Sequence, residues 1–433
     1  LTESKSATKK LRDDRPDFSK YSNEELFDQY LELLKLHRKY FSQHIFTTYM
    51  ATVPVGIISG VANAVGRPDL LLPIIAGFGE VDSAEPSHAM WDMGRLVRNN
   101  VHLTTEFDKG VTGLIDRLSQ SELPEASEFL KAFEHFVYEY GSRGPNEWEA
   151  RSPSWETRPE LALNAIDRMR LATDELAPKT QNAERATQRE QAAIELLSMV
   201  EADPEVHGEL AVGIAASAAW LPARERTKTN NIRLIHEMRM IMRAIGERMV
   251  ETNGFDEIED FGFVTDEEYA SLFAEPTSML DTIRSRREEY YKLLEREAQF
   301  LFDGQADHPD TWRRRDAVSE DILTEGEVLQ GMPGCTGSAE GTARVILDSN
   351  DPASLQPGDI LVAPLTDPSW TPLFVPAAAV VVDVGAPLSH AIIVSRELGI
   401  PCVVSATDAT RRIPDGARVN VNGDTGVITV LEV

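Results

Sequence analysis

The feature that most limits the possible folds is an abrupt change of sequence pattern near residue 325. Before it, long charged segments carry apolar residues three or four positions apart, which is the spacing of amphipathic helices. After residue 331, short β-branched runs alternate with glycine and proline turns. We therefore predict an α+β multidomain chain, with a large, mostly helical domain over residues 1–325 and a small α/β domain over residues 326–433.

Local signals place the elements of both domains. Ser22 with Glu25 three positions later has the spacing of a capping box and predicts the start of a helix. The helical segments are predicted at 22–41, 159–176, 183–202, 223–252 and 276–301, as in a helical bundle. In the second domain we predict strands at 343–347, 360–363, 379–382, 402–405, 418–422 and 427–430, and a helix at 390–398.

Composition limits the partners and the compartment. The chain has 433 residues and a formal net charge of −28, which disfavours binding to nucleic acid or to an anionic membrane surface. The two cysteines, Cys335 and Cys402, show no CxxC metal spacing and suit a reducing cytoplasm. The longest apolar stretch, residues 51–65, is short for a bilayer span and contains Pro54. We predict a cytoplasmic protein with no membrane partner, no nucleic-acid partner and no metal site.

One segment places a histidine at the start of a predicted helix. Residues 385–401 read GAPLSHAIIVSRELGIP, in which Ser389 is a suitable N-cap and Gly399 a stop signal. His390 would then lie where free backbone N–H groups and the helix dipole favour negative charge. A neutral imidazole at that place could attack phosphorus and be stabilised as an anionic phosphohistidine. An ordinary polar surface histidine is the alternative that these residues leave open.

The whole stretch from Gly331 to the C-terminus resembles the mobile, swivelling phosphohistidine domain of enzymes related to phosphoenolpyruvate synthase and pyruvate phosphate dikinase. The matching motifs occur in order at 331–337 (GMPGCTG), 341–345 (GTARV), 357–362 (PGDILV), 365–372 (LTDPSWTP), 385–401 and 422–426 (NGDTG). The resemblance implies that His390 takes up and passes on a phosphoryl group, with Ser389 beside it as a phosphate-binding residue. Ala386 is a small departure, because a second glycine is common there.

Two segments of the helical part resemble rifamycin phosphotransferases and two-subunit aryl (phenol) dikinases. One runs from Tyr140 through Arg143 and Glu147 to the motif PSWETRP, and the other is the motif ARERTK, which holds Arg224 and Lys228. Arg224 and Lys228 are four residues apart and therefore share one helix face. Two cations on one face can clamp a phosphoryl group as charge spreads over its oxygens. A solvated basic face, and a structural ion pair for Arg143 with Glu147, are the alternatives.

A hydroxyl acceptor must lose a proton, and a positioned base would speed its transfer by roughly 10²–10⁴-fold. The candidate bases in the helical part are His88, His135, His207 and His236. We single out His207 because it precedes the apolar, small-residue segment 210–220. Trp91, which has methionine neighbours, is predicted to line an apolar acceptor site, with ordinary helix packing as the alternative.

These features together predict a subunit of an ATP-dependent dikinase. As the resemblance implies, an ATP-grasp domain uses ATP and Mg²⁺ to load His390, releasing AMP and phosphate. The phosphoryl group then passes to the hydroxyl of a small phenolic or aromatic substrate. The chain shows no ATP-grasp pattern, so we expect that part on a partner subunit or a further N-terminal piece. The alternatives are part of a rifamycin-type antibiotic phosphotransferase, and a protein phosphocarrier without a small-molecule acceptor.

Overall fold

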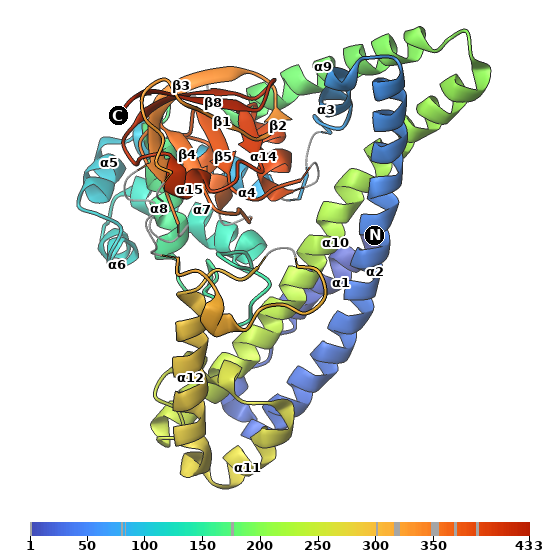
Figure 1. Ribbon diagram of the computed structural model, residues 1–433. Helices are drawn as coiled ribbons and strands as arrows, with labels where there is room; N and C mark the ends of the chain where they lie inside the picture. Colours follow the sequence, from blue (N-terminus) through green and yellow to red (C-terminus); the bar gives the residue numbers. More distant parts are fainter. Residues whose placement is uncertain are drawn as a thin grey trace.

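The computed structural model describes residues 2–78, 81–82, 84–174, 177–299, 302–315, 321–347, 355–367, 370–386 and 389–433. Helices form the N-terminal part, and a mixed β-sheet with short helices forms the C-terminal part (Figure 1), which confirms the predicted fold class. The helices of the first part are α1 (Thr2–Asp13), α2 (Asn23–Ala64), α3 (Leu71–Ile74), α4 (Glu85–Arg98), α5 (Val101–Asp108), α6 (Leu114–Ser119), α7 (Pro124–Tyr140), α8 (Glu160–Leu171), α9 (Pro178–Met199), α10 (Pro204–Glu251), α11 (Tyr269–Ala274) and α12 (Leu280–Leu294).

Two long helices, α2 and α10, lie side by side and form the spine of the helical part (Figure 1). The predicted capping box is present at the start of α2, where the Ser22 hydroxyl and the Glu25 carboxylate each accept a backbone N–H. Both helices are longer than predicted, because α2 continues through Pro54 and α10 through Pro222. Proline removes one helical hydrogen bond, and the packing of the two helices outweighs that loss here.

Small residues in the apolar segments 46–64 and 210–221 let these two helices approach closely. A Cβ atom added to Gly213 would lie only 3.1 Å from the side chain of Ile57 across the contact. These segments therefore serve helix packing. On its other side α2 exposes Phe41, Ile45 and Tyr49, each four residues from the next. By length and composition alone α2 could cross a membrane, although here it packs along α10.

The second part is built on one eight-stranded sheet in the order β1-β8-β7-β3-β4-β5-β6-β2. Its strands are β1 (Val328–Gln330), β2 (Met332–Cys335), β3 (Ser338–Val345), β4 (Ile360–Ala363), β5 (Ala379–Val382), β6 (Cys402–Val404), β7 (Arg418–Asn422) and β8 (Val427–Glu432); its helices are α13 (Thr371–Phe374), α14 (His390–Leu398) and α15 (Ala409–Arg412). The prediction missed β1 and β2, of which β2 contains a Pro-Gly pair typical of turns.

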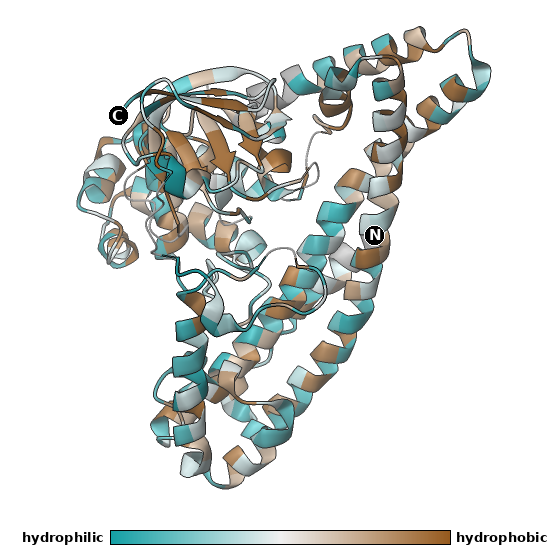
Figure 2. Ribbon diagram, in the orientation of Figure 1, coloured by the Kyte–Doolittle hydropathy of each residue, from teal (hydrophilic) through white to brown (hydrophobic). Residues whose placement is uncertain are grey.

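The central strands of this sheet are parallel and fully buried. Strands β3 to β6 run in parallel, with Ile360 paired to Ala379 and Ala363 to Val382. Every residue of β4 and β5 is buried, and these strands are uniformly apolar in Figure 2. Helices cover both faces of such a sheet, and the carboxyl ends of its strands are the usual place for a site.

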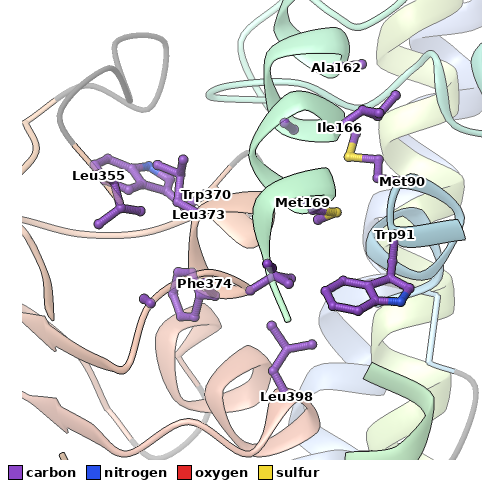
Figure 3. Packing of buried hydrophobic residues seen from close by; sticks show 14 of the residues in the cluster. Met90, Trp91, Ala162, Ile166, Met169, Leu355, Trp370, Leu373, Phe374 and Leu398 are labelled. Atoms are coloured by element: carbon purple, nitrogen blue, oxygen red, sulfur yellow. The ribbon is translucent and has the colours of Figure 1, made fainter. Parts of the chain in front are cut away.

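A shared hydrophobic core joins the two parts. Phe374 and Leu398 of the sheet part pack with Met90, Trp91 and Met169 of α4 and α8 (Figure 3). Each of these side chains is nearly or fully buried, and full burial of such a side chain stabilises by roughly 1.5–3 kcal/mol. The sheet part therefore sits docked on the helical part in this structure.

Two glycines of α10 provide a matched test of its packing. A Cβ atom on Gly246 would lie 2.3 Å from the carbonyl oxygen of Ile258, whereas nothing lies within 4 Å of one on Gly208. We expect Gly246→Ala to lower the free energy of unfolding by about 2–4 kcal/mol. Gly208→Ala should raise it by about 0.5–1 kcal/mol, since alanine is the better helix former. Denaturant titrations of both variants, followed by circular dichroism, measure this; equal effects would contradict the packing described for Gly246.

Candidate functional site

The candidate site lies at the carboxyl ends of β4 and β5. The chain leaves β5 through Gly385, where an added Cβ would come within 2.6 Å of the side chain of Val404, so only glycine fits without a shift. It then enters α14, whose first residue is His390. The helix ends at Gly399 with φ of 77°, as its predicted stop signal requires. The elements predicted around His390 are thus present, and they place its ring at the boundary with the helical part.

Two threonine hydroxyls hold the ring of His390. The Oγ1 of Thr366, from the loop after β4, lies 3.1 Å from Nδ1, and the Oγ1 of Thr371, at the start of α13, lies 3.1 Å from Nε2. Phe374 packs edge-on against the ring at 5.8 Å. Neither threonine was predicted to have a role, although both lie in the motif LTDPSWTP. Two hydroxyl residues in a motif shared with the mobile domain were the signal that could have identified them.

Ser389 has the backbone geometry of an N-cap but does not cap the helix with its side chain. Its φ and ψ are −69° and 155°, and its hydroxyl makes no cap hydrogen bond. The Oγ atom is buried and has no hydrogen-bond partner among the described residues. An available donor therefore stands beside His390, at a helix end that favours negative charge.

The charges of three cations from the helical part act on His390. Burial, together with the charges of Lys228, Arg143 and Arg224, holds the pKa of His390 well below its ordinary value. The predicted cations and the predicted phosphoryl carrier, more than 150 residues apart in sequence, therefore meet in one place. The imidazole is neutral in this docked arrangement, because a protonated ring would add a fourth positive charge.

A buried carboxylate holds two of these cations in position. Glu147 Oε2 lies 2.7 Å from Nε of Arg143, and Glu147 Oε1 lies 3.1 Å from Nζ of Lys228. The side chain of Glu147 has no exposed surface and that of Arg143 is 3% exposed, so these ion pairs are shielded from solvent. Arg143 also donates to the hydroxyl of Thr229 at 3.0 Å. Arg143 and Glu147 thus form a structural ion pair at the site itself.

The cation cluster retains donors for an anion. Nη2 of Arg143 and Nε of Arg224 are buried and have no hydrogen-bond partner within the described ranges. Arg224 pairs with its neighbour Glu225 through a different nitrogen. A buried N–H group without a hydrogen-bond partner costs free energy, and a phosphoryl oxygen could accept from both of these groups. The donor set at this boundary therefore fits a phosphorylated His390.

The loop that carries Arg143 and Glu147 also touches the sheet part directly. The backbone N–H of Asn146 donates to the Asp367 carboxylate at 2.9 Å, one residue after Thr366. A cavity of about 30 Å³ lies at the boundary, lined by residues that include Arg224, Ile393 and Arg396. It is far smaller than the roughly 300–1,000 Å³ of ligand pockets. A cavity of about 810 Å³ lies elsewhere, between α1 and the start of α2.

Two predicted site residues lie away from this cluster. His207 is in the second turn of α10, 17 residues before Arg224, which is about 25 Å along the helix axis. Trp91 is 5% exposed, stacks under the guanidinium of Arg95 at 4.2 Å and faces the shared core (Figure 3). In this arrangement His207 therefore lies far from Arg224 along α10 and Trp91 takes part in helix packing, and a role of either residue in binding substrate stays a prediction.

Of the other histidines that the sequence offered as bases, His135 is exposed on α7. His236 is buried between Glu156 and Arg239, whose guanidinium donates to its Nδ1. A histidine that the sequence did not single out, His44 of α2, does adjoin the cluster through Thr227 of α10. Its position in an aromatic helical segment gave no signal, because only the pairing of α2 with α10 brings it there.

The fold and the site define a protein with a mobile phosphohistidine-type domain docked on a helical part. Residues 355–426 match the family model described as the PEP-utilising enzyme mobile domain, and residues 43–225 match the rifampicin phosphotransferase fourth domain. The chain therefore joins a rifampicin phosphotransferase fourth domain to a C-terminal PEP-utilising mobile domain, and the predicted resemblance is confirmed.

The chain is also similar to several curated proteins. It is 32% identical over 361 residues to a rifampicin phosphotransferase of Streptomyces sviceus, which covers 81% of this chain and 40% of that protein. It is 29% identical to the uncharacterised phosphotransferase YvkC of Bacillus subtilis (81% and 42%) and 29% identical to the prodigiosin synthesizing transferase PigC of Serratia marcescens (76% and 37%). The chain thus spans about two fifths of the length of these relatives.

No group of three or more His, Cys, Asp or Glu side chains among the described residues could hold a metal ion. The prediction that Mg²⁺ and ATP are bound by an ATP-grasp part stays a prediction.

The lowered pKa of His390 predicts that docking depends on pH. An undocked His390 protonates as the pH falls through about 6.5, whereas the docked ring resists protonation. Docking is therefore fully favoured above that value and weakened below it. As the pH is lowered from 7.5 to 5.5, we expect the radius of gyration from small-angle scattering to increase in the wild type. It should change less in His390→Gln. An equal change in both proteins would assign the effect to other groups.

Proposed function

We propose that this chain carries a phosphoryl group on His390 and transfers it to a hydroxyl of an acceptor bound by the helical part, as a section of a rifampicin phosphotransferase-like enzyme. The observation that carries this proposal is that the ring of His390 lies within the electrostatic influence of Arg143, Arg224 and Lys228, two of which retain donor N–H groups without a partner among the described residues. A neutral imidazole has no charge for these cations to balance. A phosphoryl group on that imidazole explains them, because it brings about two negative charges.

The geometry supports transfer away from the histidine. The cations and the hydroxyl of Ser389 would share the charge on the three oxygens of the transferring group, and each such donor contributes roughly 10²–10³-fold in comparable sites. The same charges lower the pKa of the His390 ring. A less basic nitrogen is a better leaving group, so docking favours cleavage of the phosphorus–nitrogen bond. Loading at a different place, where the cations are absent, fits the mobile character of the domain.

The loading half of the reaction belongs to the same proposal. An ATP-grasp part would supply the phosphoryl group from ATP and Mg²⁺, with AMP and phosphate as products. The relatives are more than twice as long as the region that matches this chain, which leaves room for such a part. Whether it stands on the same chain or on a partner subunit is open to experiment.

The names of the relatives favour a hydroxylated antibiotic of the rifamycin kind as the acceptor. The sequence predicted a small phenol as the acceptor. These relatives support neither that acceptor nor a role in aromatic catabolism. One relative is named for prodigiosin synthesis, so acceptors differ within the group. We therefore place rifampicin first and simple phenols second. A protein acceptor is the remaining alternative.

Labelling tests the carrier role directly. We expect the wild-type chain, incubated with an ATP-grasp partner and ATP labelled at the β-phosphorus, to retain an acid-labile, alkali-stable label. His390→Ala should retain none, because the attacking nitrogen is absent. ATP labelled at the γ-phosphorus should release its label as inorganic phosphate. A wild-type chain that stays unlabelled while a rifampicin phosphotransferase labels under the same conditions would overturn the proposal.

Transfer tests the cation cluster. We expect Lys228→Met to slow the loss of label to rifampicin by about 10²–10³-fold while leaving the uptake of label unchanged, since Lys228 belongs to the helical part. Lys292→Met, on the exposed face of α12, is the matched control and should transfer normally. Rapid-quench measurement of protein-bound and acceptor-bound label gives both rates. A Lys228→Met chain with the wild-type rate of transfer would remove Lys228 from the site.

A further inference from the structure

A buried histidine stands next to the cation cluster on the side of α2. His44 is 8% exposed and packs against α10, where its Nδ1 lies 3.0 Å from Oγ1 of Thr227. Thr227 is the residue before Lys228 and lies one turn after Arg224. The charges of Arg224 and Lys228 act on the pKa values of both His44 and His390, so the two rings share this pair of cations.

The hydrogen bonds fix which nitrogen of His44 carries the proton. The single hydroxyl proton of Thr227 is donated to the carbonyl oxygen of Arg224 at 2.9 Å. With that proton directed to Arg224, the Thr227 oxygen is left to accept from His44, and we assign the N–H to Nδ1. In the neutral ring Nε2 then holds a lone pair. Nε2 is not among the described buried side-chain atoms that lack a hydrogen-bond partner, and the backbone of Arg224 also hydrogen-bonds to the ring.

The surroundings keep this ring neutral until an anion arrives. Burial, reinforced by Arg224 and Lys228 and opposed by Glu225, lowers the pKa of His44 to about 4. A docked phosphoryl group would bring about two negative charges to the same cations and so raise the basicity of His44. The histidine would become an effective base when the loaded domain is in place.

A partly exposed aromatic surface adjoins the ring of His44. The ring of Trp148 lies 5.8 Å from that of His44, and Phe41 lies edge-on to Trp148 at 6.0 Å. Trp148 and Phe41 are 38% and 41% exposed, unusual for such large apolar side chains. Trp148 follows Glu147 directly in the chain, so this aromatic surface is joined to the ion pairs of the site. It suits the flat apolar body of a hydroxylated aromatic molecule.

We propose that Nε2 of His44 accepts the proton of the acceptor hydroxyl during phosphoryl transfer from His390, for acceptors that carry this hydroxyl on an aromatic, apolar framework; the inference rests on the proposed function. As the acceptor oxygen bonds to phosphorus, its proton moves to Nε2. The phosphorus–nitrogen bond breaks, its electron pair stays on the ring of His390, and that ring takes up one proton from solvent to become a neutral imidazole. The proton then leaves His44⁺ for solvent, driven by the neighbouring cations once the phosphorylated product departs. No other reagent is consumed.

Single-turnover transfer separates this role from the carrier role. His390 is first loaded, by the ATP-grasp partner or by phosphoramidate, to the same occupancy in each protein, and rifampicin or 1-naphthol is then added. We expect His44→Gln to load normally and to transfer about 10²–10³-fold more slowly. His135→Gln, which changes an exposed histidine of α7, is the matched control and should load and transfer like the wild type.

Two further readouts distinguish a base from a structural residue. Added imidazole should restore part of the transfer rate in His44→Ala, and the penalty of His44→Gln should shrink for acidic nitrophenols, which need less help in losing their proton. Transfer by His44→Gln at the wild-type rate, or a penalty independent of acceptor acidity and of imidazole, would overturn the role of His44. A wild-type chain that never takes up label would instead overturn the proposed function.

Discussion

The buried carboxylate of Glu147 is the interaction on which the site depends. It pairs with Arg143 in its own loop and with Lys228 on α10, and thereby fixes two cations that would otherwise repel each other and the third, Arg224. Loss of one member of such a buried set costs about 3–5 kcal/mol, because the remaining charges are left unpaired in a poorly solvated place. Glu147 makes it possible for the protein to maintain a positive pocket before any anion enters it.

The neutral imidazole and the cation cluster come from different parts of the chain, and whether they can lie close together depends on the charge of the imidazole. A protonated His390 would oppose docking, and a neutral one tolerates it. A phosphorylated ring would be attracted, since its charge satisfies Arg143 Nη2 and Arg224 Nε. The apolar contacts of Phe374 and Leu398 with α4 and α8 hold the docked domain in place. The cation cluster favours a neutral or phosphorylated His390 over a protonated one. On the proposed function, we expect domain movement and phosphorylation to be coupled through this boundary.

Much of the mobile domain could be predicted from its sequence, because its signals are local. The strands 360–363, 379–382 and 418–422 and the helix 390–398 were predicted at the observed bounds. The first two are buried parallel strands, which read as apolar runs between turn residues, and the third is antiparallel and alternates in burial. The long helices were harder. The predicted helices ended at residue 41 and began at residue 223, whereas tertiary packing carries α2 through Pro54 and α10 through Pro222.

The sequence by itself determined the chemistry that this protein can carry: a histidine at a helix start, two cations one helical turn apart, and an Arg–Glu pair in a loop. Residue types and short spacings suffice for these, because neighbours along a helix or turn are neighbours in space. Only the tertiary structure decided which of them act together. It brought His390, Arg143 and Arg224 to one boundary, placed His207 away from them and Trp91 in the shared core, and added Thr366, Thr371 and His44. Contacts between α2, α10 and the sheet are set by packing over long chain separations, which short stretches of sequence do not encode.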